Sequence, residues 1–313
     1  MHDARVAADR LRGGLYGLLV GDALGVPYEF HPPGELPAAA ELEMDPPPDF
    51  ARAHRGTPPG TFSDDGAQAL ALLASLLDRG RLDVDDFGAR LVGWYERGDY
   101  AVDGRVFDCG IQTRRAIERM KAGAPAASAG GAGERDNGNG SLMRVLPLAL
   151  FHDGDDAALV RDAMAQSGPT HAHPRSRVAC ALYCLWARRE LAGDPLAYES
   201  AAAALPALLD GALAEELARH VLADGPPRGR GSGYVVDCLH SARFACAAAS
   251  SYEGVVKAAI ALGDDTDTTA CVAGGIAGIR FGEVNIPERF RAALRGREIV
   301  DPLADRLVAR RAG

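Results

Sequence analysis

One oxygen-rich segment constrains this chain more than any other feature. Residues 264–269 read Asp-Asp-Thr-Asp-Thr-Thr, so three carboxylates and three hydroxyls occupy six positions, and an Ala/Gly-rich run follows at once. Hard cations such as Mg²⁺, Mn²⁺ and Ca²⁺ prefer oxygen ligands to sulfur or imidazole. A second acidic cluster, Ser63-Asp64-Asp65, lies far upstream. Two such clusters can hold two cations that orient a substrate and an oxygen nucleophile.

Both clusters also fit a simpler interpretation, because each one precedes an apolar helical pattern. Asp, Thr and Ser are favoured at helix N-termini, where they accept hydrogen bonds from free N–H groups and complement the helix dipole. One good residue is enough to cap a helix, so capping does not explain Asp265 and Asp267 together. Like charges this close repel unless a cation lies between them. We therefore predict metal binding and keep capping as the alternative.

The length and the hydrophobic pattern predict one all-α domain. The chain has 313 residues, of which 47% are hydrophobic, enough for a sizeable core. Few segments alternate like strands, and helical periodicity dominates. The expected helices lie around residues 6–19, 70–77, 87–95, 142–150, 156–167, 175–191, 198–222 with an interruption at Pro206, 235–249, 252–262 and 268–279. Residues 31–60, 122–140 and 224–233 are rich in Gly, Pro or small residues, so we expect loops there.

Charge and cysteine content limit the partners. The net charge of -9 disfavours a non-specific nucleic-acid binder, which requires a basic face. An anionic substrate is still possible, because bound cations can reverse the local field. The six cysteines form no Cys-x-x-Cys pair, which indicates a reducing, cytoplasmic compartment. The sequence contains no signal-peptide core and no apolar run long enough to cross a bilayer, so we expect no membrane partner.

Two further segments carry candidate functional residues. Residues 17–30 are punctuated by glycine and contain Glu29 between Tyr28 and Phe30. Partial desolvation there would raise the pKa of Glu29 toward acid–base use, although the glycines alone indicate only close helix packing. Residues 137–144 place an amide-rich turn before a helix. N–H groups at a helix N-terminus suit a phosphate, and an ordinary Asn-Gly connection is the alternative.

Isolated residues give weaker signals. Asp108 precedes another expected helix start, and Tyr234 could either stack on a base or pack in the core or at a rim. His171 and His173 lie two residues apart without a third ligand at zinc spacing, which favours polar loop histidines. His152 and Asp153 form a His-Asp pair that invites comparison with all-α metal phosphohydrolases of the HD type. The upstream histidine motif of those enzymes is missing.

Taken in order along the chain, these segments resemble the ADP-ribosylglycohydrolase family. The resemblance covers about residues 10–282 and rests on Gly21-Asp22-Ala23-Leu24-Gly25 through Glu29, Ser63-Asp64-Asp65, Asp108-x-Gly110, Gly138-Asn139-Gly140-Ser141-Leu142-Met143-Arg144, Thr170-His171, Gly233-Tyr234-Val235-Val236 and Asp265-Thr266-Asp267-Thr268-Thr269. It implies a compact, orthogonal multi-helix bundle with a binuclear site for two divalent cations, Mg²⁺ or Mn²⁺.

The resemblance also implies roles for individual positions. The metal ligands would be Ser63, Asp64, Asp65, Asp265, Asp267 and Thr268. Around the nucleotide, Glu29 would lie beside the distal ribose, Asn139, Gly140 and Ser141 would face the diphosphate, His171 would lie along the nucleotide, and Tyr234 would lie near the adenine. The chain departs from the family pattern at Gly66, where Thr is common, and at His173, where Asp is common. It also departs at Asp264, where Gly or Asn is common, and we expect this residue to add a carboxylate beside the metals. These departures bear on substrate detail and metal preference.

The implied activity is hydrolysis of the glycosidic bond at C1 of an ADP-ribosyl group, in the first place a bond to arginine. Such a bond breaks through an oxocarbenium-like transition state. A water beside the metals would attack C1, Glu29 or Asp65 could accept its proton, and Asp108 could assist departure of the guanidine. The alternatives are serine or O-acyl linkages, or a non-catalytic relative that binds ADP-ribose. The expected partner is an ADP-ribosylated protein or a small ADP-ribosyl conjugate, and we expect a monomer.

Overall fold

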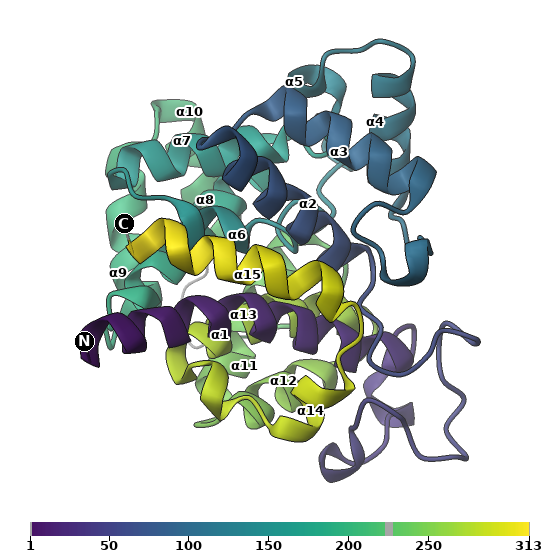
Figure 1. Cartoon of the computed structure of the whole chain (residues 1–313). Helices are drawn as coiled ribbons and strands as arrows, with labels where there is room; N and C mark the ends of the chain where they lie inside the picture. Colours follow the sequence, from purple (N-terminus) through teal and green to yellow (C-terminus); the bar gives the residue numbers. More distant parts are fainter. Residues whose placement is uncertain (1, 223–227, 313) are drawn as a thin grey trace.

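The computed structural model describes residues 2–222 and 228–312, and within these ranges every regular element is a helix (Figure 1). The α-helices are α1 (His2–Gly25), α2 (Asp64–Arg79), α3 (Val84–Arg97), α4 (Ile111–Lys121), α5 (Ala126–Ala129), α6 (Leu146–Phe151), α7 (Asp156–Ser167), α8 (Pro174–Leu191), α9 (Ala197–Ala204), α10 (Gly211–Glu216), α11 (Val235–Ala248), α12 (Tyr252–Ile260), α13 (Thr266–Phe281), α14 (Glu288–Ala293) and α15 (Arg297–Ala312). The predicted all-α class is confirmed.

Short helical turns fill several connections between these helices. They are η1 (Val26–Tyr28), η2 (Pro33–Glu35), η3 (Ala39–Glu41), η4 (Val102–Gly104), η5 (Leu205–Leu208), the π-helical turn η6 (Leu217–Val221) and η7 (Glu283–Asn285). The predicted loop at residues 224–233 falls partly outside the described residues, up to residue 227.

The helices α1 and α13 pack against each other along their lengths at the centre of the molecule (Figure 1). Their backbones approach so closely because glycines line the contact. A Cβ on Gly21 would lie 2.1 Å from the carbonyl oxygen of Ala270, and a Cβ on Gly278 would lie 1.9 Å from that of Gly13. The glycine punctuation of residues 17–30 therefore has the packing role expected of it. The close approach also sets the first turn of α13 against the last turn of α1.

Most predicted helices agree with the structure to within a few residues, and α7 has the predicted bounds. Two segments differ. The predicted 142–150 helix begins only at Leu146, because residues 141–144 form turns. The 198–222 segment breaks after α9 into η5, α10 and η6, so it is interrupted more than once.

The sequence analysis did not predict α14 and α15, and it expected a loop at 122–140, where the short helix α5 lies. Along α15 the buried side chains are few, and Pro302 lies inside the helix, so its periodic signal is weak. This helix nevertheless packs beside α1, where it is drawn in yellow (Figure 1). None of the described helices combines the length and the apolar character that a membrane span requires.

Candidate active site

The two predicted acidic clusters meet at the N-termini of α2 and α13. The Thr268 hydroxyl lies 3.5 Å from Asp65 Oδ1 and joins the clusters. Asp22 of α1 holds the start of α2 in place, because its carboxylate accepts hydrogen bonds from the N–H groups of Ser63 at 2.9 Å and Gly66 at 2.8 Å. Asp22 is buried, and the sequence analysis gave this residue no role of its own.

Capping explains only part of these clusters. Ser63 is the N-cap of α2, and its hydroxyl accepts from Asp65 N–H at 3.3 Å. Asp265 is the N-cap of α13 but makes no side-chain capping bond, and its Oδ2 accepts from Asn139 Nδ2 at 2.8 Å instead. The capping alternative therefore holds for Ser63 but does not account for the carboxylates of the two clusters.

Two carboxylate oxygens are buried without a partner. Asp65 Oδ2 and Asp267 Oδ2 have no hydrogen bond within the described part of the chain. Burial, reinforced by neighbouring carboxylates, raises the pKa values of Asp64, Asp65 and Asp267 well above their usual range. Buried polar atoms are normally satisfied, and a lone buried charge is costly. A divalent cation would supply the missing partner, so the donor set fits Mg²⁺ or Mn²⁺.

A cavity of about 330 Å³ lies beside the acidic clusters. The predicted site residues that line it are Glu29, Asp64, Asp65, Asp108, Asn139, Gly140, His171, Asp265 and Thr268. Ser63 and Asp267 are buried and do not line it. Carboxylate oxygens of Glu29, Asp265 and Asp267 lie within 4.8 Å of one another. The fold therefore brings together residues that are more than 200 positions apart in the sequence.

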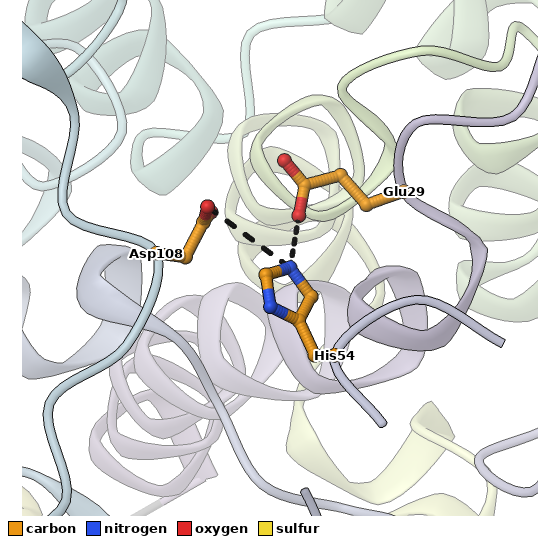
Figure 2. A group of neighbouring side chains, drawn as sticks. All are labelled: Glu29, His54 and Asp108. Atoms are coloured by element: carbon orange, nitrogen blue, oxygen red, sulfur yellow. Dashed lines mark hydrogen bonds and ion pairs between the residues drawn. The ribbon is translucent and has the colours of Figure 1, made fainter. Parts of the chain in front are cut away.

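The carboxylates of Glu29 and Asp108 both point toward the imidazole of His54 (Figure 2). His54 Nε2 lies 2.5 Å from Glu29 Oε2 and 4.0 Å from Asp108 Oδ1. The imidazole also packs on aromatic rings, with centroid distances of 5.5 Å to Phe30 and 5.1 Å to Phe107. Sequence analysis missed His54, because a single histidine in a Pro/Gly-rich loop carries no spacing signal.

The backbone is strained around this group. Phe30, His54 and Asp108 have positive φ angles of 64°, 45° and 55°. Non-glycine residues rarely adopt this conformation, and it persists where surrounding structure enforces it, often at functional sites.

Burial dominates the electrostatics at the cavity mouth. It raises the pKa of Glu29 to about 11, with further increases from Asp108 and Asp265. Burial and Asp265 raise the pKa of Asp108 to about 6. The pKa of His54 is lowered by burial, followed by Arg105 and Arg52. Without a bound cation, these shifts favour the neutral forms of Glu29 and His54.

The glycine-rich turn lines the same cavity through Gly138, Asn139 and Gly140. Asn139 N–H donates to Gly233 O at 3.0 Å, and Val235 N–H donates to Asn137 O at 2.9 Å, which ties the turn to the start of α11. Because α6 begins only at Leu146, the turn does not sit at a helix N-terminus, and the phosphate argument based on such a terminus was wrong.

Two residues of the glycine-rich turn, Gly140 and Ser141, also have a structural role. A Cβ on Gly140 would lie 2.8 Å from His171 Cε1, so glycine is required here by the imidazole itself. Ser141 is buried, and its Oγ accepts from Ser167 Oγ at 2.8 Å. The Ser141 hydroxyl thus faces the interior, and Ser141 does not line the cavity. Tyr234 lies beside Gly233 of the lining, is 39% exposed, and its hydroxyl accepts from Arg175 Nη1 at 3.3 Å.

The structure accounts for the three departures from the family pattern. A Cβ on Gly66 would lie 2.7 Å from Leu19 Cδ2, so that space is already filled. Asp264 was expected to add a carboxylate beside the metals, and this was wrong: it is exposed, does not line the cavity and has a φ of 56°. His173 caps α8 by accepting from Arg175 N–H at 3.1 Å. His152 and Asp153 lie at the end of α6, where Asp153 pairs with Arg310.

Known proteins resemble this chain over most of its length. The family model for ADP-ribosylglycohydrolase matches residues 3–313, beyond the range noted from sequence. ADP-ribosylarginine hydrolase Tri1 of Serratia proteamaculans (strain 568) is 32% identical over 307 residues, 96% of this chain and 79% of that protein. ADP-ribosyl-[dinitrogen reductase] glycohydrolase of Rhodospirillum rubrum is 31% identical over 297 residues, 91% of this chain and 90% of that protein.

A solved structure is similar as well. It is described as an ADP-ribosylglycohydrolase-related protein complex, and it matches with a TM-score of 0.76 and 33% identity over 98% of this chain and 99% of that chain. Fold, family model and relatives agree, and this chain belongs to the ADP-ribosylglycohydrolase family.

Proposed function

We propose that this enzyme hydrolyses the N-glycosidic bond between C1 of ADP-ribose and an arginine side chain and uses two divalent cations, Mg²⁺ or Mn²⁺. The observation that carries the proposal is the pair of partnerless, buried oxygens of Asp65 and Asp267 beside a 330 Å³ cavity. The arginine linkage is supported by two relatives named ADP-ribosylarginine hydrolase, at 32% and 29% identity.

The proposed metal ligands come from the two helix N-termini, and they are Ser63, Asp64, Asp65, Asp265, Asp267 and Thr268. Bound cations would offset the buried negative charge, fix the ribose hydroxyls and lower the pKa values of Glu29 and of a nearby water. Asn139, Gly140, Ser141, His171 and Tyr234 are the proposed nucleotide-binding residues. Of these, Ser141 would act through its backbone, since its hydroxyl faces inward.

Glu29 and Asp108 have complementary proposed roles. Glu29 accepts the proton of the attacking water, whose oxygen forms the new bond to C1, and Asp65 is the second candidate for this base. Asp108 donates a proton to the guanidine nitrogen as the C1–N bond breaks, and burial of its carboxyl favours the protonated form that this role requires. His54 holds Glu29 from the loop side. The products are ADP-ribose and free arginine.

The wider setting is also a proposal. We propose a single-domain, monomeric, cytoplasmic enzyme whose partner is an ADP-ribosylated protein or a small ADP-ribosyl conjugate. The free state of all six cysteines supports a reducing compartment, and the continuous hydrophobic cluster supports a single domain.

A side-by-side comparison of three ADP-ribosyl linkages tests the proposal directly. Arginine-, serine- and acetyl-linked ADP-ribose are incubated with enzyme that has been chelated and then supplied with Mg²⁺ or Mn²⁺. We expect metal-dependent release of ADP-ribose, fastest from arginine. Faster release from serine or acetyl conjugates would contradict the arginine assignment. Binding of ADP-ribose without turnover of any substrate would favour the non-catalytic alternative.

A further inference from the structure

A buried arginine, Arg144, lies behind the cavity wall. Arg144 is fully buried, and its guanidinium carbon lies 5.1 Å from the centroid of the Phe87 ring. Its hydrogen-bond partners among the described residues are all neutral, and they are Gln68, Gln166 and Thr170. A buried charge held only by neutral groups is costly, so its presence needs a reason.

The direction of these hydrogen bonds is fixed by chemistry. A guanidinium can only donate, so every neighbour must turn an acceptor toward it. Arg144 Nη1 donates to Gln68 Oε1 at 2.8 Å, and Nη2 donates to Thr170 Oγ1 at 2.8 Å. Nη2 also donates to the carbonyl oxygen of Gln166 at 3.1 Å. The bridging side chains must then direct their own hydrogens away from the arginine.

Three hydrogen-bonded connections, which we call arms, run from Arg144 to residues of the site. Gln68 Nε2 donates to Asp64 Oδ2 at 2.8 Å, and Gln166 Nε2 donates to the carbonyl oxygen of Ser141 at 3.2 Å. Thr170 Oγ1 lies 2.8 Å from His171 Nδ1. One cation therefore orients groups at the acidic cluster, at the glycine-rich turn and at the histidine of the cavity wall.

The third arm determines where the proton of His171 lies. Thr170 is buried, its oxygen accepts from Arg144, and the remaining partner for its hydroxyl hydrogen in the described chain is His171 Nδ1. An Nδ1 that accepts this hydrogen bond carries no proton, so a neutral ring carries its proton on Nε2. Nε2 lies 3.4 Å from the position of a Cβ built on either Gly138 or Gly140, and both glycines line the cavity.

We propose that Arg144, acting through Thr170, fixes His171 in the Nε2–H tautomer and thereby makes it a hydrogen-bond donor toward the cavity. Arg144 is a positioning residue, since its own atoms do not line the cavity. Burial, followed by the charge of Arg144, lowers the pKa of His171 to about 3, so the ring is neutral at neutral pH. That the donor meets an oxygen of an ADP-ribosyl ligand rests on the proposed function, whereas the tautomer itself does not.

Long-range ¹⁵N–¹H correlation spectra of the labelled, ligand-free protein test the tautomer. Loss of signals in His171→Asn assigns the ring. We expect a protonated Nε2 and an unprotonated Nδ1 whose shift reflects an accepted hydrogen bond. In Thr170→Val the Nδ1 shift should move toward that of a free acceptor, and Thr170→Ser should keep the wild-type pattern. A proton on Nδ1 in the wild type, or an unchanged Nδ1 shift in Thr170→Val, would overturn the proposal.

Calorimetric affinity for ADP-ribose tests the consequence. Thr170→Val should weaken binding about 5-fold, the effect of one ordinary hydrogen bond, and Thr170→Ser should restore it. Thermal melting and metal content of each variant control for folding. Equal affinity in Thr170→Val would overturn the donor role. If the wild type shows the Nε2–H tautomer but does not bind ADP-ribose, the proposed function fails and the tautomer assignment stands. The wild-type spectrum is decisive even if Thr170→Val does not fold.

Discussion

The two walls of the cavity differ in how their polar groups are satisfied. On the acidic wall, oxygens of Asp65 and Asp267 are buried without a hydrogen-bond partner in the described chain. Behind the wall that carries His171, Arg144 and the side chains around it bond to one another and to the backbone. Each wall is buried and polar, so burial alone does not separate them.

The difference indicates which wall binds a cation. An unsatisfied buried carboxylate is destabilising until a cation binds, whereas a completed network is rigid. The acidic wall should therefore gain stability when the ligand is present, and the Arg144 wall should contribute stability at all times. Substitutions on the two walls should then have effects of opposite sign.

The largest expected effect is on the acidic side, at Glu29. Glu29→Gln should reduce single-turnover cleavage of ADP-ribosyl-arginine by about 10²–10⁴-fold, the scale of general-base catalysis. ADP-ribose affinity and metal binding should change little, because the amide keeps the shape. Near-normal single-turnover chemistry in this variant would move the base assignment to Asp65 or Asp108. A loss of affinity as large as the loss of turnover would mean that Glu29 only gates the ribose.

Asp267→Asn should lower metal affinity by at least about 100-fold, since replacing even a supporting residue of a metal site costs about 10–100-fold. Turnover at limiting Mg²⁺ should fall with it. In chelator the variant should melt at the same temperature as the wild type or higher, because one repelling charge is gone. Titration with Mg²⁺ and thermal melting measure both effects. A variant with unchanged activity and unchanged melting in Mg²⁺ would make Asp267 a helix-capping residue only.

Arg144→Met tests the other wall and should have the opposite sign in chelator. It leaves acceptors of Gln68, Gln166 and Thr170 unsatisfied in the interior, so we expect a loss of about 2–4 kcal/mol in the free energy of unfolding. Urea denaturation with and without Mg²⁺ gives the value. Methionine is a suitable replacement because it fills much of the same space. A variant as stable as the wild type would remove the contrast between the walls.

The pH dependence of stability gives the most graded effect. Burial raises the pKa of Asp108 to about 6 and that of Asp22 to about 7, above the usual range of an aspartate. Between the usual pKa of an aspartate and these raised values, the folded chain binds more protons than the unfolded chain. The free energy of unfolding in chelator should therefore fall as pH rises from about 4 to 7. Each group contributes at most about 1.4 kcal/mol per pH unit. Denaturation curves should show a flatter slope in saturating Mg²⁺, and identical slopes would contradict the cation site.

Substitution of Gly140 would not distinguish a phosphate-binding role of the turn from a packing role. A side chain there would displace His171 before it met any ligand, since the ring lies 2.8 Å from the Cβ position. Weaker ADP-ribose binding in Gly140→Val would thus follow from a displaced imidazole as readily as from a blocked phosphate. Substitution of Thr170 is the sharper probe of that wall.

Much of the fold and of the acidic wall could be predicted from local sequence. Segment 156–167 has regular apolar spacing and is α7 in the structure. Charged and hydroxyl residues concentrated at positions 63–65 and 264–269 indicate a hard cation through composition alone. Helices with few buried positions, such as α15, gave no such signal.

Only the tertiary structure decided how distant residues meet. His54 reaches Glu29 from an irregular loop, and Arg144 reaches Asp64 and His171 through side chains that share no spacing with it. It also showed that Asp264 is exposed and does not line the cavity. Sequence fixes local periodicity and the chemistry of short clusters, because these depend on neighbours along the chain. Long-range contacts depend on how loops close and helices dock, and no local pattern encodes them.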